Sequence, residues 1–469
     1  MLDGYGHDLK PYPEYRDSGL PWLGRIPSHW EVRRNGRLFA QRNETGCGDL
    51  PILEVSLKTG VRVRNMDDLK RKQVMADREK YKRAARGDIA YNMMRMWQGA
   101  VGVSPEDGLV SPAYVVARPY PEAEPRFFSY LFRTDAYKNE VDGYSRGIVK
   151  DRNRLYWEDF KRMPSCLPPL DEQKVIADYL DANAAKVRRF IRNRRRLIEV
   201  LNEQKQAIIN RAVTRGLDPN VPLRPSGIDW LGDIPEHWDV RRNKLIFCER
   251  IESGTDGMPL LVVSLRTGVT IGEEVDGRGR PKRLIEDRAK YKRACIGDLA
   301  YNMMRLWQGA VGTVPVDGLV SPAYVVAKPI REVVPHFFEH LLRTPGYMGS
   351  VNRESRGIVS DRNRTYWDNF KQLSSPFPPV DEQADIVEFI DAETRSFCDS
   401  TTLATREIEL VREYRTRLIA DVVTGKVDVR HLPEALGDES VEPEELSGSI
   451  EDDEIQTDDE PQLAGEVES

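Results

Sequence analysis

The sequence repeats itself at an offset of about 208–210 residues. The segment SGLPWLGRIPSHWEVRRN, starting at Ser18, returns as SGIDWLGDIPEHWDVRRN, starting at Ser226. Further along, Gly87–Pro119 and Gly297–Pro329 are identical at 27 of 33 positions. Solenoid repeats have periods of roughly 20–50 residues, so a period this long indicates two similar domains in one chain.

Each copy ends in a proline pair followed by acidic residues, PPLDEQ at Pro168 and PPVDEQ at Pro378. A proline pair is rigid and non-helical, an Asp after it can cap a helix, and a Glu in the first turn suits the helix dipole. A long helix is therefore expected to start at each motif. Gly216 and Gly425 supply the expected C-terminal stops.

Both expected helices carry apolar residues at alternating steps of four and three, which is the spacing of a coiled-coil seam. Polar Arg194, Lys205 and Arg415 fall in the same frame, where they would fix the register at a cost in stability. The alternative is two unrelated amphipathic helices that lie on their own domains. The apolar seam residues named for the two helices are Leu180, Val187, Ile191, Ile198, Leu201, Ile208, Ile390, Phe397, Ile408, Val411 and Leu418.

The globular parts mix strand and helix patterns. PLLVVSLRTGV and LVSPAYVVAKP are typical of buried strands, and RFFSYLFRTDAYKNEV of a helix. We therefore expect an α/β (α+β) chain with a pseudo-twofold internal repeat, in which two similar domains are separated by two long helices that form an antiparallel coiled coil. The expected boundaries are 1–170 and 217–380 for the domains, 171–216 and 381–430 for the helices, and 431–469 for an acidic tail.

The net charge of −6 conceals a basic body. Residues 431–469 carry 15 Asp or Glu and no Lys or Arg, so the preceding chain has 70 basic against 61 acidic residues, a net charge of +9. A basic body favours a polyanionic partner, whereas an acidic tail without aromatic residues is typical of a solvated, disordered segment.

The five cysteines are odd in number and show no CxxC spacing, so neither a disulfide framework nor a zinc site is implied. His29 and His237 have no second His or Cys nearby at ligand spacing; we expect each to form a hydrogen bond where the chain enters its domain. Apolar runs are far shorter than the roughly 20 residues that span a bilayer. We expect a cytoplasmic protein with no metal site and no membrane association.

The order of these motifs, from the first globular part through PPLDEQ, VTRGLDPNVPL and PPVDEQ to VVTGKVDVR, closely resembles the specificity subunits of type I restriction-modification systems. The resemblance covers roughly residues 12–431. It implies two target-recognition domains that each read half of a split DNA sequence, with the two conserved helices as an antiparallel spacer. About 40 helical residues at 1.5 Å each would make that spacer roughly 60 Å long.

The resemblance also implies a chain without chemistry of its own, that is, not an enzyme. It would bind double-stranded DNA and two methylation subunits that methylate adenine N6, and possibly restriction (motor and nuclease) subunits. S-adenosylmethionine, ATP and Mg are expected on those partner subunits, and this chain is expected to bind no cofactor.

Three duplicated segments are candidates for DNA contact, because Arg, Asn and Gln can read base edges, while Lys, Arg and glycine-flanked main chain suit phosphates. The alternatives are a charged loop, core packing and a simple turn, respectively. The candidate residues are Arg146, Lys150, Arg152, Asn153 and Arg154 with Arg356, Arg362, Asn363 and Arg364; Asn92, Arg95 and Gln98 with Asn302, Arg305 and Gln308; and Lys58 with Arg266.

The spacer helices are less alike than the domains: Lys174–Arg215 and Ala384–Gly425 share only 10 of 42 positions. Because the expected DNA readers are duplicated nearly residue for residue, we expect two similar, inverted half-sites, hence an interrupted and nearly palindromic target. Two rival interpretations remain. A stand-alone nucleic-acid enzyme is disfavoured because no phosphate loop or methyltransferase motif is present; a bivalent DNA-binding regulator without catalytic partners stays open.

Overall fold

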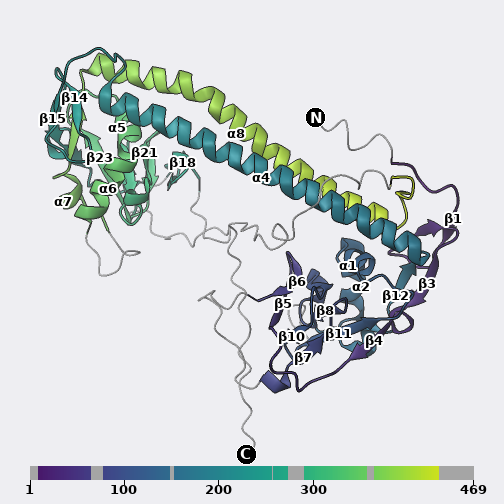
Figure 1. The fold of residues 1–469 in the computed structure, drawn as a ribbon. Helices are drawn as coiled ribbons and strands as arrows, with labels where there is room; N and C mark the ends of the chain where they lie inside the picture. The colour runs from purple at the N-terminus through teal and green to yellow at the C-terminus, as the bar shows by residue number, and fades with distance from the viewer. Residues whose placement is uncertain are drawn as a thin grey trace, which may run out of the picture. The chain divides into compact units, whose positions relative to one another are not determined.

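The computed structural model describes residues 9–64, 78–147, 153–255, 257–272, 290–355 and 364–432. The chain divides into two compact units. The first unit comprises residues 1–194 and 406–448, and the second comprises 195–405 and 449–469. Each unit therefore contains a globular part together with stretches of both long helices (Figure 1).

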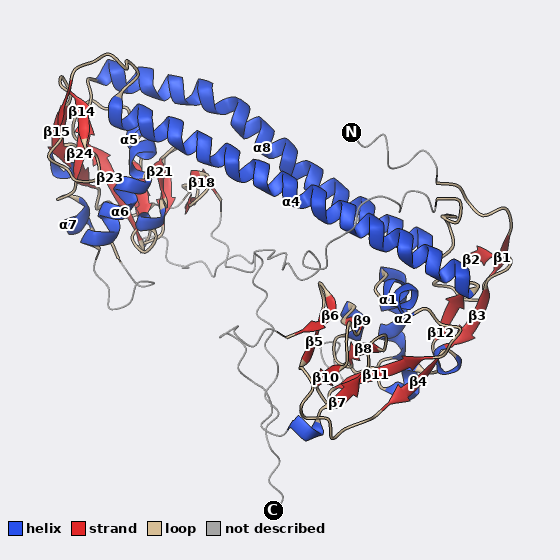
Figure 2. Cartoon of the chain, viewed as in Figure 1, coloured by secondary structure: helices blue, strands red, loops and turns tan. Residues whose placement is uncertain are grey.

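The first unit is built on a four-stranded antiparallel sheet in the order β4-β11-β8-β9. The central strands β11 and β8 are the most buried, since β-branched and aromatic residues fill them on both faces. Short hairpins and helix α1 surround this sheet, and α1 packs against β9 (Figure 2). The strands are β1 Tyr15–Asp17, β2 Arg25–Pro27, β3 Glu31–Arg34, β4 Phe39–Arg42, β5 Leu53–Ser56, β6 Gly60–Val63, β7 Lys82–Ala84, β8 Ile89–Asn92, β9 Val101–Val103, β10 Gly108–Val110, β11 Tyr114–Pro119 and β12 Pro164–Leu167.

The segment expected to form one helix, RFFSYLFRTDAYKNEV, forms two, α1 Pro125–Phe132 and α2 Asp135–Tyr144. The break falls at Thr134, whose hydroxyl oxygen accepts a hydrogen bond from the Tyr137 amide at 3.3 Å and so caps α2. The prediction of a single helix was wrong because it read the apolar pattern without this cap. The short helix α3, Trp157–Phe160, follows and precedes β12.

The second unit repeats the same sheet order as β16-β23-β20-β21. Its helices α5 Pro335–Leu342 and α6 Pro345–Glu354 break at Thr344, which caps α6 as Thr134 caps α2. Helix α7 spans Trp367–Phe370. The strands are β13 Leu223–Pro225, β14 Asp233–Pro235, β15 Asp239–Arg242, β16 Phe247–Glu249, β17 Leu261–Ser264, β18 Gly268–Ile271, β19 Lys292–Ala294, β20 Leu299–Asn302, β21 Val311–Thr313, β22 Gly318–Val320, β23 Tyr324–Pro329 and β24 Ser374–Phe377.

The two long helices are α4, Leu170–Arg215, and α8, Val380–Val423. Each begins one residue before the Asp that was expected to cap it, directly after its proline pair; the Gln173 amide donates to the Pro169 carbonyl at 2.9 Å. Asp171 and Asp381 therefore lie in the first turn, where a negative charge still suits the dipole. Gly216 follows α4 with a φ of 72°, as the predicted stop requires.

Stretches of the two helices lie side by side within each unit (Figures 1 and 2). In the first unit the Arg194 Nε lies 2.8 Å from a Glu407 carboxylate oxygen, and the Cys166 thiol, just before α4, lies 3.4 Å from the Val423 carbonyl oxygen. The paired stretches therefore run in opposite directions. None of the residues in the predicted apolar frame is exposed: Leu180, Val187, Ile191, Ile390, Ile408, Val411 and Leu418 are buried, and Ile198, Leu201, Ile208 and Phe397 are half-buried.

Candidate nucleic-acid interface

The turn that follows β8 holds one group of candidate readers, and its main chain is tightly organised. The Asn92 side-chain oxygen accepts from the Met94 amide at 2.9 Å, and Gly99 ends the turn with a φ of 91°. The second unit repeats both features, since Asn302 accepts from the Met304 amide at 2.9 Å. One function of this asparagine is thus to shape the turn, which sequence reasoning missed when it named the residue only as a base reader.

The other candidates on this turn differ in exposure. Gln98, Gln308 and Arg305 are exposed, whereas Arg95 is half-buried. Met96, on the same turn, is fully buried in the hydrophobic core of the first unit. The exposed polar side chains are therefore the ones that can meet a ligand.

The second candidate segment lies directly beside this turn in both units. The Leu155 amide donates to the Met93 carbonyl at 2.9 Å, and the Thr365 amide donates to the Met303 carbonyl at 2.8 Å. Residues about 60 positions apart are thus joined by the same main-chain hydrogen bond in each copy. The fold brings two separately predicted reader segments together.

The ends of the loop in the first unit are closed by main-chain hydrogen bonds between Arg146 and Arg154, at 3.0 and 2.9 Å. The Arg146 guanidinium donates to Asp159 at 2.6 Å, and the Asn153 amide donates to Asp142 at 2.9 Å. Arg146 and Asn153 thus make contacts within the protein. Lys150, Arg152, Arg356, Arg362 and Asn363 lie outside the described residues.

Arg154 and Arg364 are both exposed at the end of this loop. The Arg154 guanidinium makes no hydrogen bond or ion pair to another residue in the described ranges. The Arg364 guanidinium donates a hydrogen bond to the nearby Tyr366 hydroxyl at 3.4 Å. Of the loop candidates that the structure describes, these two arginines are the ones most available to a phosphate or a base edge.

The third candidates, Lys58 and Arg266, are exposed in the turns of hairpins β5-β6 and β17-β18. The side chain of Arg133, which follows α1, donates to the Leu57 and Lys58 carbonyls at 2.6 and 2.8 Å and holds the first turn in place. Burial lowers the pKa of Arg133, and the nearby charge of Arg415 lowers it further.

Gly60 is needed in the first of these turns. It has a φ of 75°, and a Cβ on Gly102 of the adjacent β9 would come within 2.8 Å of the Gly60 Cα. The β5-β6 hairpin and β9 therefore approach more closely than larger residues would allow. The turn that carries Lys58 thus lies against β9, the strand that follows the turn carrying Asn92.

Two buried polar clusters were not predicted as units. Glu172, in the first turn of α4, accepts from the Tyr12 hydroxyl at 2.7 Å, from the Trp30 indole at 2.9 Å and lies 2.8 Å from the His29 Nε2. His237 likewise lies 2.8 Å from Glu382. The expectation that each histidine forms a hydrogen bond at the domain entrance is confirmed, although its partner, the start of a long helix, could not be read from the sequence.

The second cluster joins Asn35, Tyr137 and Ser165 in the core of the first unit. The Asn35 amide donates to the Tyr137 hydroxyl at 2.8 Å, and the Ser165 hydroxyl donates to the Asn35 side-chain oxygen at 2.7 Å. Asn243, Tyr347 and Ser375 repeat the arrangement in the second unit. A signal for it was present in the sequence, because all three residue types recur at the repeat offset.

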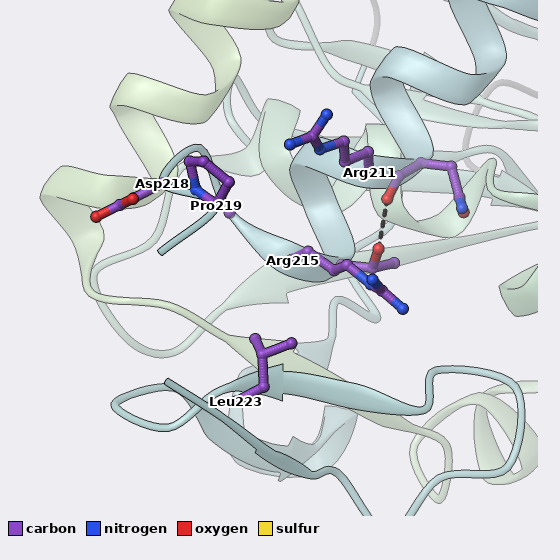
Figure 3. Close-up of a pocket in the computed structure, with 8 residues that line it drawn as sticks. Arg211, Arg215, Asp218, Pro219 and Leu223 are labelled. Atoms are coloured by element: carbon purple, nitrogen blue, oxygen red, sulfur yellow. Dashed lines mark hydrogen bonds between the residues drawn. The ribbon is translucent and has the colours of Figure 1, made fainter. Parts of the chain in front are cut away.

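A cavity of about 490 Å³ lies at the C-terminal end of α4 in the second unit (Figure 3). The Thr214 hydroxyl donates to the Asn210 carbonyl at 2.6 Å, and Arg211 and Arg215 lie nearby on the same helix. None of the candidate readers lines this cavity. Over the described ranges, no group of three or more His, Cys, Asp or Glu side chains gathers in a way that could hold a metal ion.

No helix in the described part of the chain has the length and hydropathy needed to cross a membrane.

The five cysteines are all free thiols. Burial raises the pKa of Cys166 to about 12.

Comparison with curated proteins identifies relatives along nearly the whole chain, although no family model matches it. The chain is 23% identical over 444 residues to a putative specificity subunit of the type I restriction enzyme MjaX from Methanocaldococcus jannaschii, covering 87% of this chain and 96% of the relative. It is 27% identical over 245 residues to the specificity subunit of the type I restriction enzyme EcoBI from Escherichia coli, covering 48% of this chain and 50% of that one. The resemblance to type I specificity subunits is thus confirmed.

A solved structure shares the fold. It comes from a study of complex assembly and conformational transition of a type I restriction-modification system, and it aligns with a TM-score of 0.61 at 14% identity over 85% of this chain and 98% of that chain. Both curated relatives are specificity subunits, the kind of chain that the sequence resemblance implies has no chemistry of its own.

Proposed function

We propose that this chain, which is similar along most of its length to type I specificity subunits, is the sequence-specific DNA-recognition subunit of such a system. In this proposal it reads a bipartite, interrupted DNA site and directs adenine-N6 methylation and restriction by partner subunits. Two methylation subunits would bind S-adenosylmethionine, and restriction subunits would use ATP and Mg.

One observation carries the proposal. In each unit the same main-chain hydrogen bond joins the turn after a central strand, β8 or β20, to the end of the arginine-rich loop. Its donor and acceptor are Leu155 and Met93 in the first unit, and Thr365 and Met303 in the second. Two copies of one composite surface suit a DNA site with two halves. The exposed Gln98, Gln308, Arg154 and Arg364 are the described side chains best placed to contact it.

The proposed rod between the readers is an antiparallel coiled coil of α4 and α8, and the proposed symmetry is a pseudo-twofold axis between the domains. The burial of the 3.5-residue frame on both helices and the opposite directions of the paired stretches support both ideas. The domain boundaries stay predictions: 1–170 and 217–380 for the target domains, 171–216 and 381–430 for the helices, and 431–469 for the tail.

The test is to co-express the chain with its methylation subunit in a host that lacks the system and to sequence the methylated bases of the genomic DNA. We expect methylated adenines on both strands of one interrupted, nearly palindromic motif, and none when either subunit is expressed alone. Two unrelated half-sites would refute the near-palindrome but not the recognition function. Tight binding to one site without any methylation would favour the stand-alone regulator instead.

Arginine substitutions then separate the two readers. Arg152→Ala and Arg362→Ala are expected to relax sequence preference at opposite half-sites, by a cost of about 1–3 kcal/mol for each lost base contact. A uniform loss across all sequences would show instead that these side chains contact phosphates.

A further inference from the structure

The two arginine-rich loops are nearly identical in sequence, SRGIVKDRNR at Ser145 and SRGIVSDRNR at Ser355, yet their surroundings differ. In the first unit, carboxylates hold both ends of the loop: Asp159 accepts from Arg146 at 2.6 Å, and Asp142 accepts from Asn153 at 2.9 Å. At the repeat offset of 210 residues, both carboxylates are replaced by neutral amides, Asn369 and Asn352.

The contact to Asp159 is an anchoring one. The Asp159 side chain is only 8% exposed, whereas that of Arg146 is 67% exposed. A carboxylate buried to this degree needs a counter-charge, and the Arg146 guanidinium supplies it from the solvent side. Because Arg146 also forms the main-chain bridge to Arg154, the ion pair ties the base of the loop to helix α3.

Asn369 makes a different contact in the second unit. Its amide donates to the Glu354 carbonyl at 2.8 Å, at the end of α6, and it carries no charge for an arginine to neutralise. Among the described residues at the base of that loop, the Ser355 and Thr365 hydroxyls lie 2.7 Å apart. Leu155 occupies the position of Thr365 in the first unit.

We propose that Asp142 and Asp159 are positioning residues that fix the base of the DNA-reading loop in the first unit, whereas the second unit carries neutral asparagines at both matching positions. The inference rests on the proposed DNA-recognition function. Ordering in advance two side chains that binding would otherwise immobilise is expected to strengthen discrimination at one half-site by about tenfold.

The first test needs no DNA. Backbone hydrogen exchange is measured on the full-length wild-type chain and on Asp159→Asn, with Glu158→Gln as the matched control, because Glu158 is the adjacent carboxylate and pairs with Lys161 on the surface. We expect the Arg154 amide to exchange about tenfold faster in Asp159→Asn and to be unchanged in Glu158→Gln. The second unit carries Asn at the matching position, so the variant is expected to fold. Unchanged exchange in Asp159→Asn would overturn the anchoring function.

The second test uses DNA, once the methylation map has defined the target. Binding of the complex with its methylation subunits is compared on the intact site and on sites with one half scrambled. Asp159→Asn should reduce discrimination by about tenfold at one half-site only, and Asn369→Asp with Asn352→Asp should increase it at the other. Equal changes at both half-sites, or none, would overturn the inference. Failure of the wild-type complex to recognise any site would instead refute the proposed function.

Discussion

Glu172 is a buried carboxylate of the first unit that several side chains contact, and removing it is expected to destabilise that unit strongly. Its side chain is 5% exposed and lies at the first turn of α4. It accepts hydrogen bonds from the buried Tyr12 hydroxyl and Trp30 indole, and the half-exposed His29 lies within 2.8 Å. The carboxylate thus ties the N-terminal segment of the unit to the start of the long helix.

The expected loss can be worked out from these contacts. A hydrogen bond to a charged group contributes about 1.5–3 kcal/mol, and a donor left buried without a partner costs about 1–3 kcal/mol. Glu172→Ala leaves two buried donors, the Tyr12 hydroxyl and the Trp30 indole, without an acceptor. A loss of about 3–5 kcal/mol in the free energy of unfolding is therefore expected. The contact with His29 adds little, because water screens its 37% exposed side chain.

The second unit offers a matched comparison. Glu382 is 25% exposed and accepts from the Trp238 indole at 3.0 Å; Asn220 stands at the position of Tyr12. Glu382→Ala therefore leaves one buried donor without an acceptor rather than two. It should lower the free energy of unfolding by about 1.5–3 kcal/mol. The prediction is thus a difference of about 2 kcal/mol between two substitutions that are identical in chemistry and in place in the repeat.

The assay must resolve the units, because a chain with two compact units need not unfold in one step. Hydrogen exchange at increasing urea concentration, followed separately on core strands β8 and β20, gives the free energy of opening for each unit. Glu172→Gln, which keeps one acceptor oxygen, should fall between wild type and Glu172→Ala. Equal losses for Glu172→Ala and Glu382→Ala, or a loss below 1 kcal/mol for Glu172→Ala, would refute the reasoning.

Two further predictions concern single positions. Gly425→Ala should destabilise the first unit by several kcal/mol in urea unfolding, because φ is 77° and a Cβ would lie 2.4 Å from the Pro27 ring; Gly19→Ala, with a φ of 73° but open space around it, should cost only about 1 kcal/mol of backbone strain. The hydrogen bond that the His336 ring donates to the Glu339 carboxylate raises the pKa of His336. This contact therefore stabilises the second unit fully below about pH 6.5 and is lost as pH rises through the raised value. His336→Gln should therefore flatten the decline in thermal stability of that unit as pH rises above about 6.5, and an unaltered decline would contradict this.

The features that were predictable from the sequence are those written in local patterns. The two long helices follow from a proline pair, an acidic first turn and a sustained 3.5-residue period, and Gly216 marks the end of one of them. The similarity of the two units follows from the repeat itself, because near-identical segments such as Gly87–Pro119 and Gly297–Pro329 must fold alike.

The anchoring of the loop was not predictable, because it depends on which of several acidic residues is buried nearby. The structure pairs Arg146 with Asp159, which is 13 positions away and is carried by helix α3. Only the folded chain shows that Asp159 is buried and therefore needs this charge.

A polar residue in the helical seam favours one alignment of α4 with α8, although it reduces the apolar surface buried there. Arg194 forms an ion pair with Glu407 and lies over the Phe190 ring, with its Cζ 5.0 Å from the ring centroid. Displacing α8 by one heptad in either direction would put Ser400 or Tyr414 in the place of Glu407 and leave a half-buried guanidinium without a carboxylate.

Lys205 makes another polar contact in the seam, with its Nζ 3.1 Å from the Cys398 sulfur in the second unit. An apolar seam with a regular period tolerates a shift of seven residues, whereas the Arg194–Glu407 ion pair matches one alignment only. If the proposed coiled coil spaces two DNA readers, its length must not vary. A seam that gives up some apolar burial for an ion pair that fixes the register is then what the function requires.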